Sequence, residues 1–175
     1  SENYDGIFAP VSIETAAMII SQARDAGITC PIMAGDTWDD ISIAQRTGHK
    51  ATDVYFSAVF DADDTTKEAG KAFVEGFKAW VAEDNTRIEN NGGTADAISS
   101  VTPCGYDAYM AAVNAIEAAN STEGPAIRDA LASLNVPGLI TGDLSFDENG
   151  DAVKTYAVIK TIKDGQIVYF STYNG

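Results

Sequence analysis

The amino-acid sequence predicts an α/β protein in which helices cover both faces of a parallel sheet, a three-layer αβα arrangement. The main observation is that short apolar segments alternate with helical patterns over the first third of the chain. Strand, helix and strand in succession form right-handed crossovers, which bring the strands into one sheet in parallel. A second observation is the alternation of apolar and polar residues at 154–173, which is typical of strands with one buried face.

Composition narrows the classes of function. The chain has 175 residues, enough for one or two domains, and 45% of them are hydrophobic. Its 26 acidic and 11 basic residues give a net charge of −15, which repels phosphate backbones and anionic lipids. We therefore expect no nucleic-acid partner. No apolar run approaches the roughly 18 residues of a membrane span. The first residues lack the basic-then-apolar layout of a signal peptide, although a secretory segment removed earlier is compatible with the sequence.

The first strand and helix are predicted at residues 5–11 and 13–27. Ser12 precedes the helix as a natural N-cap, and Glu14 favours its first turn. Gly27 is expected to end the helix. Four apolar residues recur at helical spacing and define the buried face: Ala16, Ile19, Ile20 and Ala23.

The stretch "PIMAGDTWDD" at residues 31–40 places a carboxylate and a large aromatic directly after a buried strand. In open α/β sheets, ligands gather at the carboxyl ends of such strands. Asp36 and Trp38 therefore suit a ligand with a cation, such as an α-amino acid, by ion pairing and aromatic packing. The alternative is structural: Gly35 and Asp36 form a turn, Thr37 caps the next helix with Asp40 in a T-x-x-D box, and Trp38 packs on the core.

The middle of the chain is predicted to be largely helical. A short helix at 38–48 ends at Gly48, and a third strand follows at 52–60. Residues 67–85 form a long helix after a polar connection. Its buried face is expected to contain Phe73, Phe77, Trp80 and Val81.

Two further helices and a β-rich tail complete the prediction. Residues 86–101 show no clear period and are interpreted as a loop with at most a helical turn. Helices follow at 102–120, with Thr102 as cap and Pro103 in first position, and at 124–134. The tail is β from residue 142, and Asp164 with Gly165 forms the turn of a terminal hairpin.

No catalytic motif is found. The sequence lacks G-x-S-x-G, a P-loop and G-x-G-x-x-G, and its single His49 lies in a polar segment. The acidic segments at 61–66 and 146–151 are typical of solvated turns, and the second lacks the ligand spacing of a calcium loop. Cys30 and Cys104 have no zinc-site spacing and fit either one disulfide or two separate thiols. We expect no enzymatic activity, no metal and no cofactor.

Three stretches in order resemble the periplasmic leucine/isoleucine/valine-binding protein family of ABC importers. They are "MIISQARDAGITCPIMAGDTWDD", "GYDAYMAAVNAIEAANSTEGPAIRDAL" and "TGDLSFDENGDAVKTYAVIKTIKDGQIV". The resemblance covers most of the chain. It implies a type I periplasmic binding fold, in which two α/β lobes close on a ligand about a hinge, and it implies that this chain is the C-terminal portion of such a receptor.

The resemblance also divides the chain. Residues 1–62 would form part of the second lobe, 63–142 would return to the first lobe, and 143–175 would supply a β-hairpin region and a hinge crossing. Residues 85–101 depart from the family pattern and are interpreted as an insertion. A missing N-terminal portion, or a second copy of the chain, would complete the cleft.

Site residues follow from the same resemblance. The acidic residue of the family's "GGD"-like turn, which takes the ligand's α-ammonium, is Asp36 here. The position after the first strand, often a ligand-facing tyrosine, is Ser12, which leaves the identity of the ligand open. Tyr106 matches the family's tyrosine near hinge and cleft, although core packing explains it nearly as well. Val11 and Gly35 would line the site through their backbone.

The resemblance implies a solute-binding component that is not an enzyme and that acts in the periplasm or outside the cell. A lipid anchor on the full-length protein is compatible with it. The ligand would be an amino acid with an apolar side chain, delivered to an ABC permease. The alternative is a sensor of amides or other small metabolites with the same fold. Cys30 would lie in the second lobe and Cys104 in the first, so we expect no disulfide between them, since Cα atoms more than about 7 Å apart cannot be bridged.

Overall fold

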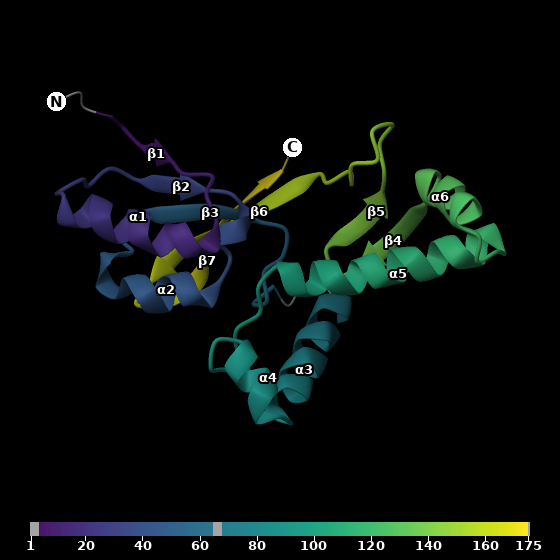
Figure 1. Cartoon of the computed structure of the whole chain (residues 1–175), viewed down its shortest axis with the longest axis horizontal. Coiled ribbons are helices and arrows are strands. Elements are labelled where there is room, and N and C mark those ends of the chain that lie inside the picture. Colours follow the sequence, from purple (N-terminus) through teal and green to yellow (C-terminus); the bar gives the residue numbers. More distant parts are fainter. Residues whose placement is uncertain (1–3, 65–67, 175) are drawn as a thin grey trace.

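The computed structural model describes residues 4–64 and 68–174. Figure 1 shows an elongated molecule with a twisted sheet at one end and a long helical extension at the other. We call the sheet with its two covering helices the sheet layer. Its strands are β1 (Ile7–Phe8), β2 (Ile32–Ala34), β3 (Val54–Ala58), β6 (Tyr156–Lys163) and β7 (Gln166–Asn174), in the spatial order β1-β2-β3-β6-β7.

The sheet is mixed. Strands β1, β2 and β3 are parallel, as predicted, whereas β6 pairs antiparallel with β3 and β7 pairs antiparallel with β6. The terminal hairpin is confirmed, and both turn residues, Asp164 and Gly165, have positive φ, as a tight hairpin turn requires. The α/β class is confirmed. The sheet is mixed rather than parallel throughout, because the returning hairpin joins it and pairs with β3 on the side away from β2.

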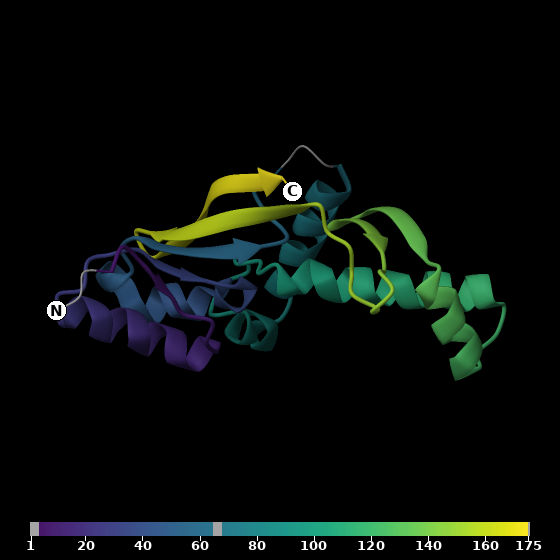
Figure 2. The ribbon, with the colours of Figure 1, turned by 90° about the horizontal axis from the view of Figure 1, so that it is seen from above.

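Helices cover only one face of this sheet in the described part of the chain. Both α1 (Ile13–Asp25) and α2 (Ile41–Thr47) lie on the same side, as Figure 2 shows. Their apolar residues form the main core with Ile32, Val54 and Phe56 from the strands. The opposite face exposes the side chains of Phe8, Met33, Phe170 and Tyr173. The described residues therefore form two layers rather than the three expected.

The remainder, which we call the helical arm, extends from the sheet layer. It contains α3 (Glu68–Ala82), α4 (Asn85–Asn90), α5 (Val101–Ala119), α6 (Gly124–Ala132) and the hairpin of β4 (Asn135–Leu139) and β5 (Gly142–Ser145). The predicted helices are present, but α5 begins with Val101 and has Ser100, not Thr102, at the N-cap. Helix α4 is the short helical turn allowed at the start of the expected loop, and its N-cap Asp84 accepts hydrogen bonds from Thr86 N and Arg87 N. Strand β4 was not predicted, because Pro137 and Gly138 interrupt it.

The core of the arm is small. Phe60, Ile98 and Ile140 form its buried cluster, against which Phe73 and Phe77 of α3 pack. The prediction for Trp80 was wrong, since its residue surface is 51% exposed. Its ring lies against the guanidinium of Arg87, with 4.2 Å from Cζ to the ring centroid.

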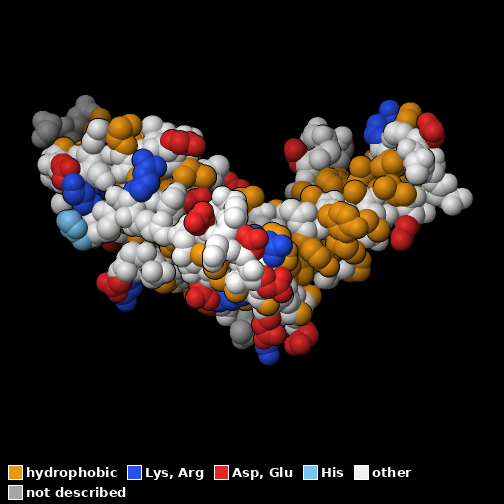
Figure 3. Space-filling view, turned by 60° about the horizontal axis from the view of Figure 1, so that its bottom comes forward, with side chains coloured by type: hydrophobic (Ala, Val, Ile, Leu, Met, Phe, Trp, Pro, Cys, Tyr) orange, Lys and Arg blue, Asp and Glu red, His pale blue; other side chains and the backbone are white. Residues whose placement is uncertain are grey.

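Much apolar surface of the arm is uncovered. Helix α6 has no buried residue among those described, and Val101, Tyr109 and Ile116 of α5 are exposed. Figure 3 shows hydrophobic side chains gathered over this end of the molecule. Within the described part of the chain, no helix has both the length and the apolar character needed to cross a bilayer.

A buried carboxylate fixes α5 to the β4–β5 turn. Asp107 accepts hydrogen bonds from Ile140 N at 2.9 Å, Thr141 N at 2.8 Å and Thr141 Oγ1 at 2.7 Å. Lys154 Nζ donates to the same threonine hydroxyl at 2.8 Å. This network connects the arm to the segment that returns to the sheet.

We expect Asp107→Ala to lower the free energy of unfolding by about 2–3 kcal/mol, because two buried backbone N–H groups lose their acceptor. Urea unfolding followed by circular dichroism measures the change. Asp143→Ala is the matched control, since its carboxylate accepts a single hydrogen bond from Gly138 N at an exposed turn. An equal, small effect of both substitutions would contradict the assigned role of Asp107.

Candidate functional site

The loops after β1 and β2 meet at the carboxyl edge of the parallel strands. The carbonyl oxygen of Val11 accepts a hydrogen bond from Trp38 Nε1 at 3.1 Å, and Thr37 Oγ1 donates to the same oxygen at 3.4 Å. Two loops distant in sequence are thereby joined. This edge of the sheet faces the start of the helical arm (Figure 1).

Trp38 supports the loop from inside. Its side chain is fully buried, and it packs with Ile20 and Phe56 in the main core. The ring therefore offers no surface to a ligand in this structure, and the structural alternative for Trp38 is the one observed. The carbonyl oxygen of Val11 already accepts hydrogen bonds from Trp38 Nε1 and Thr37 Oγ1. Both of its lone pairs are therefore engaged within the protein.

Asp36 begins the short 3-10 helix η1 (Asp36–Trp38) and is exposed. Among the described residues, no hydrogen bond to its carboxylate is formed. The cap of α2 is Asp40, whose Oδ1 accepts from Ser42 N at 2.8 Å, so the interpretation of Thr37 as the cap was wrong. Asp36 is thus a carboxylate at the sheet edge with no local structural task.

Ser12 and Gly35 flank the same edge. Ser12 lies at the N-cap of α1 as predicted, but its hydroxyl bonds to Thr15 Oγ1 at 2.9 Å and not to the helix backbone. Gly35 has open space where a Cβ would stand. Together with Asp36, these residues form a small polar surface at the sheet edge.

Tyr106 lies on α5, which approaches this edge. Its ring centroid is 5.6 Å from that of Phe73, and the residue is 44% exposed, so it is packed on one side and open on the other. Nearby, burial raises the pKa of the Cys104 thiol; Lys154 opposes this, while the charges of Asp107 and Asp36 add to it. The carboxylate of Asp36 is therefore within electrostatic reach of the start of α5.

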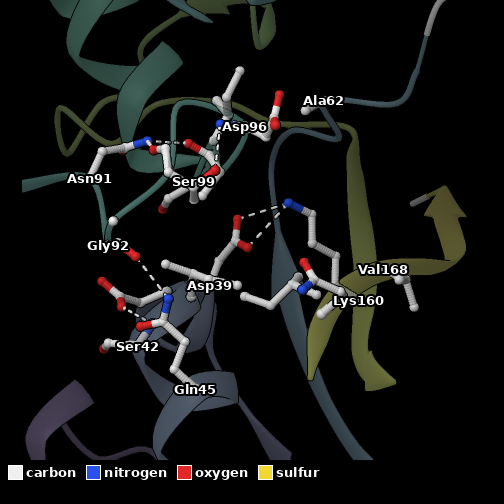
Figure 4. Close-up of a pocket in the computed structure, with 18 of the residues that line it drawn as sticks. Asp39, Ser42, Gln45, Ala62, Asn91, Gly92, Asp96, Ser99, Lys160 and Val168 are labelled. Carbon is white, nitrogen blue, oxygen red and sulfur yellow. Dashed lines mark hydrogen bonds and ion pairs between the residues drawn. The ribbon is translucent and has the colours of Figure 1, made fainter. Parts of the chain in front are cut away.

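A cavity of the described structure lies elsewhere. It has a volume of about 730 Å³ and is bounded by α2, residues 89–99 and the start of β7 (Figure 4). None of the six residues expected to contact a ligand lines it. Its position marks the junction of sheet layer and helical arm rather than the predicted site.

A buried ion pair borders this cavity. Lys160 Nζ lies 2.9 Å from Asp39 Oδ2 and 3.2 Å from Oδ1, and the two residues are 4% and 3% exposed. Asp39 Oδ2 also accepts a hydrogen bond from Ser100 N at 2.8 Å. Figure 4 shows the two side chains pointing toward each other. Sequence reasoning missed the pair; the available signal was a lysine on the buried face of an alternating strand.

The cysteines and acidic residues support no further chemistry. Cys30 and Cys104 are both free thiols. In the part of the chain that the structure describes, no group of three or more His, Cys, Asp or Glu residues could hold a metal ion.

Comparison with known proteins gives a family and a fold. A family model described as periplasmic binding protein matches residues 1–166. A comparison with curated proteins gives no match. Among solved structures, the leucine-binding protein LivK from Thermotoga maritima is similar with a TM-score of 0.77 and 28% identity over 97% of this chain and 45% of that chain.

Two further solved structures agree. The branched-chain amino-acid substrate-binding protein LivJ from Streptococcus pneumoniae, in complex with isoleucine, has a TM-score of 0.72 and 27% identity over 95% of this chain and 44% of that chain. An ABC-transporter substrate-binding protein from Desulfitobacterium hafniense, in complex with Leu, has a TM-score of 0.68 and 25% identity over 95% of this chain and 43% of that chain. This chain spans less than half of the length of each.

Proposed function

This chain belongs to the periplasmic binding protein family, and from that premise we propose that it is part of the solute-binding component of an ABC importer. The component acts outside the cytoplasm, in the periplasm or at the cell surface with or without a lipid anchor. It is not an enzyme: it binds a solute and delivers it to a membrane permease.

The proposed ligand is an amino acid with an apolar side chain. The observation that carries this proposal is the exposed Asp36 carboxylate, which has no local partner and lies where the loops of two parallel strands meet. A carboxylate in that position suits the α-ammonium group of an amino acid. The solved relatives that bind leucine and isoleucine support the same class of ligand.

The proposed receptor has two lobes. Residues 1–62 lie in the second lobe, 63–142 belong to the first, and 143–175 return across the hinge. The carboxylate of the ligand is held by a first lobe completed from outside this chain, either by the rest of the receptor or by a second copy. Tyr106 borders the cleft from α5, while Ser12, Val11 and Gly35 border it from the sheet edge.

A second candidate is a sensor of amides or other small metabolites. It is favoured by Ser12, because the family often has a ligand-facing tyrosine at this position. Without that aromatic wall, the site would admit ligands of other shapes. Calorimetry of the complete receptor against the proteinogenic amino acids and simple amides tests both. Micromolar or tighter binding of an apolar amino acid is the expected result. Binding of an amide alone would replace the first proposal by the second.

We expect this chain alone to self-associate. One sheet face and most of the arm expose apolar side chains, and contiguous exposed apolar surface of this kind marks an interface. Light scattering of the purified chain measures its mass in solution. A compact monomer that binds an amino acid at micromolar concentration would contradict the proposal that the cleft needs additional chain.

A further inference from the structure

A short segment of the helical arm, residues 91–100, contacts the sheet layer, and we call it the latch loop. A second contact is made by Tyr156 of β6, whose hydroxyl donates a hydrogen bond to Thr141 O at 3.1 Å. Gln45 Nε2 on α2 donates a hydrogen bond to Gly92 O at 2.8 Å. At the other end of the loop, Ser100 N donates to Asp39 Oδ2 at 2.8 Å. Figure 4 labels Asn91, Gly92, Asp96 and Ser99 of this loop among the residues that line the cavity. The loop is therefore fastened to the sheet layer at both ends.

The latch loop is also braced from the side of the arm. Asn91 Nδ2 donates to Thr94 O at 2.7 Å and to Ala97 O at 2.9 Å, which fixes the shape of the loop. Asp96 pairs with Lys78 of α3 at 3.2 Å, and Ile98 is buried in the apolar cluster of the arm. The loop is therefore attached to the arm as well as to the sheet layer.

Asp39 contacts both the latch loop and the candidate site. Its carboxylate is held by Lys160 on β6 and by Ser100 N, while its own N–H donates to Asp36 O at 3.0 Å. The residue that receives the latch loop is thus bonded directly to the backbone of Asp36.

We propose that the latch loop sets the orientation of the helical arm relative to the sheet layer, and that Asp39 is a positioning residue that couples this orientation to Asp36. The ligand-related part of this inference rests on the proposed function. The claim that the latch loop sets the orientation of the arm does not rest on it, because the contacts of the loop are present without ligand.

Gly92→Ala is the test variant. Gly92 has φ +73°, and an added Cβ would lie 2.5 Å from Ile41 Cγ2 on α2. Either the Ile41 side chain or the loop must therefore shift, which disturbs the packing of the latch loop on α2. In the ligand-free complete receptor, we expect hydrogen exchange in the 94–101 peptide, which contains the buried Ser100 amide, to be at least about 10-fold faster, and amino-acid affinity to fall about 5- to 10-fold.

Gly93→Ala is the matched control. Gly93 has φ +81°, but nothing lies within 4 Å of an added Cβ, so the backbone strain is similar and the clash with α2 is absent. Its exchange and affinity should remain near those of the unmodified receptor. Gln45→Ala, which removes only the exposed bond to Gly92 O, should raise the exchange rate in the same direction if Gly92→Ala does not fold.

The outcomes separate the two proposals. Equal exchange in the Gly92 and Gly93 variants, or no change in Gln45→Ala, overturns the latch. Faster exchange with unchanged amino-acid affinity overturns the positioning role of Asp39. Absence of amino-acid binding in the unmodified receptor overturns the proposed function, while the exchange result still decides whether the loop fastens the arm.

Discussion

Replacing Lys160 by Met lowers the free energy of unfolding by about 3–5 kcal/mol, because Asp39 is left as a buried charge without its partner. Lys160 is 4% exposed, so its ammonium group is largely shielded from solvent. The remaining donor to the Asp39 carboxylate, the backbone N–H of Ser100, cannot neutralise it. Urea unfolding followed by circular dichroism or tryptophan fluorescence measures the change.

A double variant separates loss of the ion pair from loss of the lysine itself. In Asp39→Asn with Lys160→Met, no buried charge remains, and the asparagine oxygen still accepts a hydrogen bond from Ser100 N. We expect this variant to recover most of the lost stability, since neutral replacement of a buried pair is often close to neutral in energy. Lys163→Met is the control on the same strand, because Lys163 is exposed. If Lys160→Met and Lys163→Met unfold at the same urea concentration, the pair does not stabilise the fold.

Asp36→Asn weakens amino-acid binding by the complete receptor by about 2–5 kcal/mol, the range for removing one partner of a desolvated charge pair. The substitution keeps the shape of the side chain but removes the charge that would pair with the α-ammonium. Stability should change little, because Asp36 is exposed and caps no helix. Isothermal titration calorimetry with the tightest-binding amino acid gives the difference in affinity.

Asp40→Asn is the matched control for Asp36→Asn. It lies in the same loop and loses the same charge, and asparagine caps a helix about as well as aspartate. Its affinity should therefore remain near that of the unmodified receptor. An Asp36→Asn receptor with unchanged affinity would remove Asp36 from the binding site and leave it as a turn carboxylate.

The placement of the candidate site could be predicted in part from the sequence. Val11 and Asp36 follow two strands predicted to be parallel, and the carboxyl ends of parallel strands share one edge. The structure has both at that edge. For Trp38, the sequence was compatible with either ligand contact or packing in the core. The structure has the ring in the core, where the indole N–H donates a hydrogen bond to Val11 O. Local sequence could not decide this, since the acceptor belongs to a different loop.

The sequence by itself determined the local elements. Helix α1, which ends before Gly27, and the hairpin turn at Asp164 and Gly165 follow from apolar periodicity and turn chemistry, which act between near neighbours. Only the tertiary structure decided that β6 pairs with β3, that one sheet face is left open, and that Lys160 pairs with Asp39 across 121 residues of sequence. The physical reason is that a buried charge must find its partner in space, and the path of the chain, not the local sequence, brings that partner within reach.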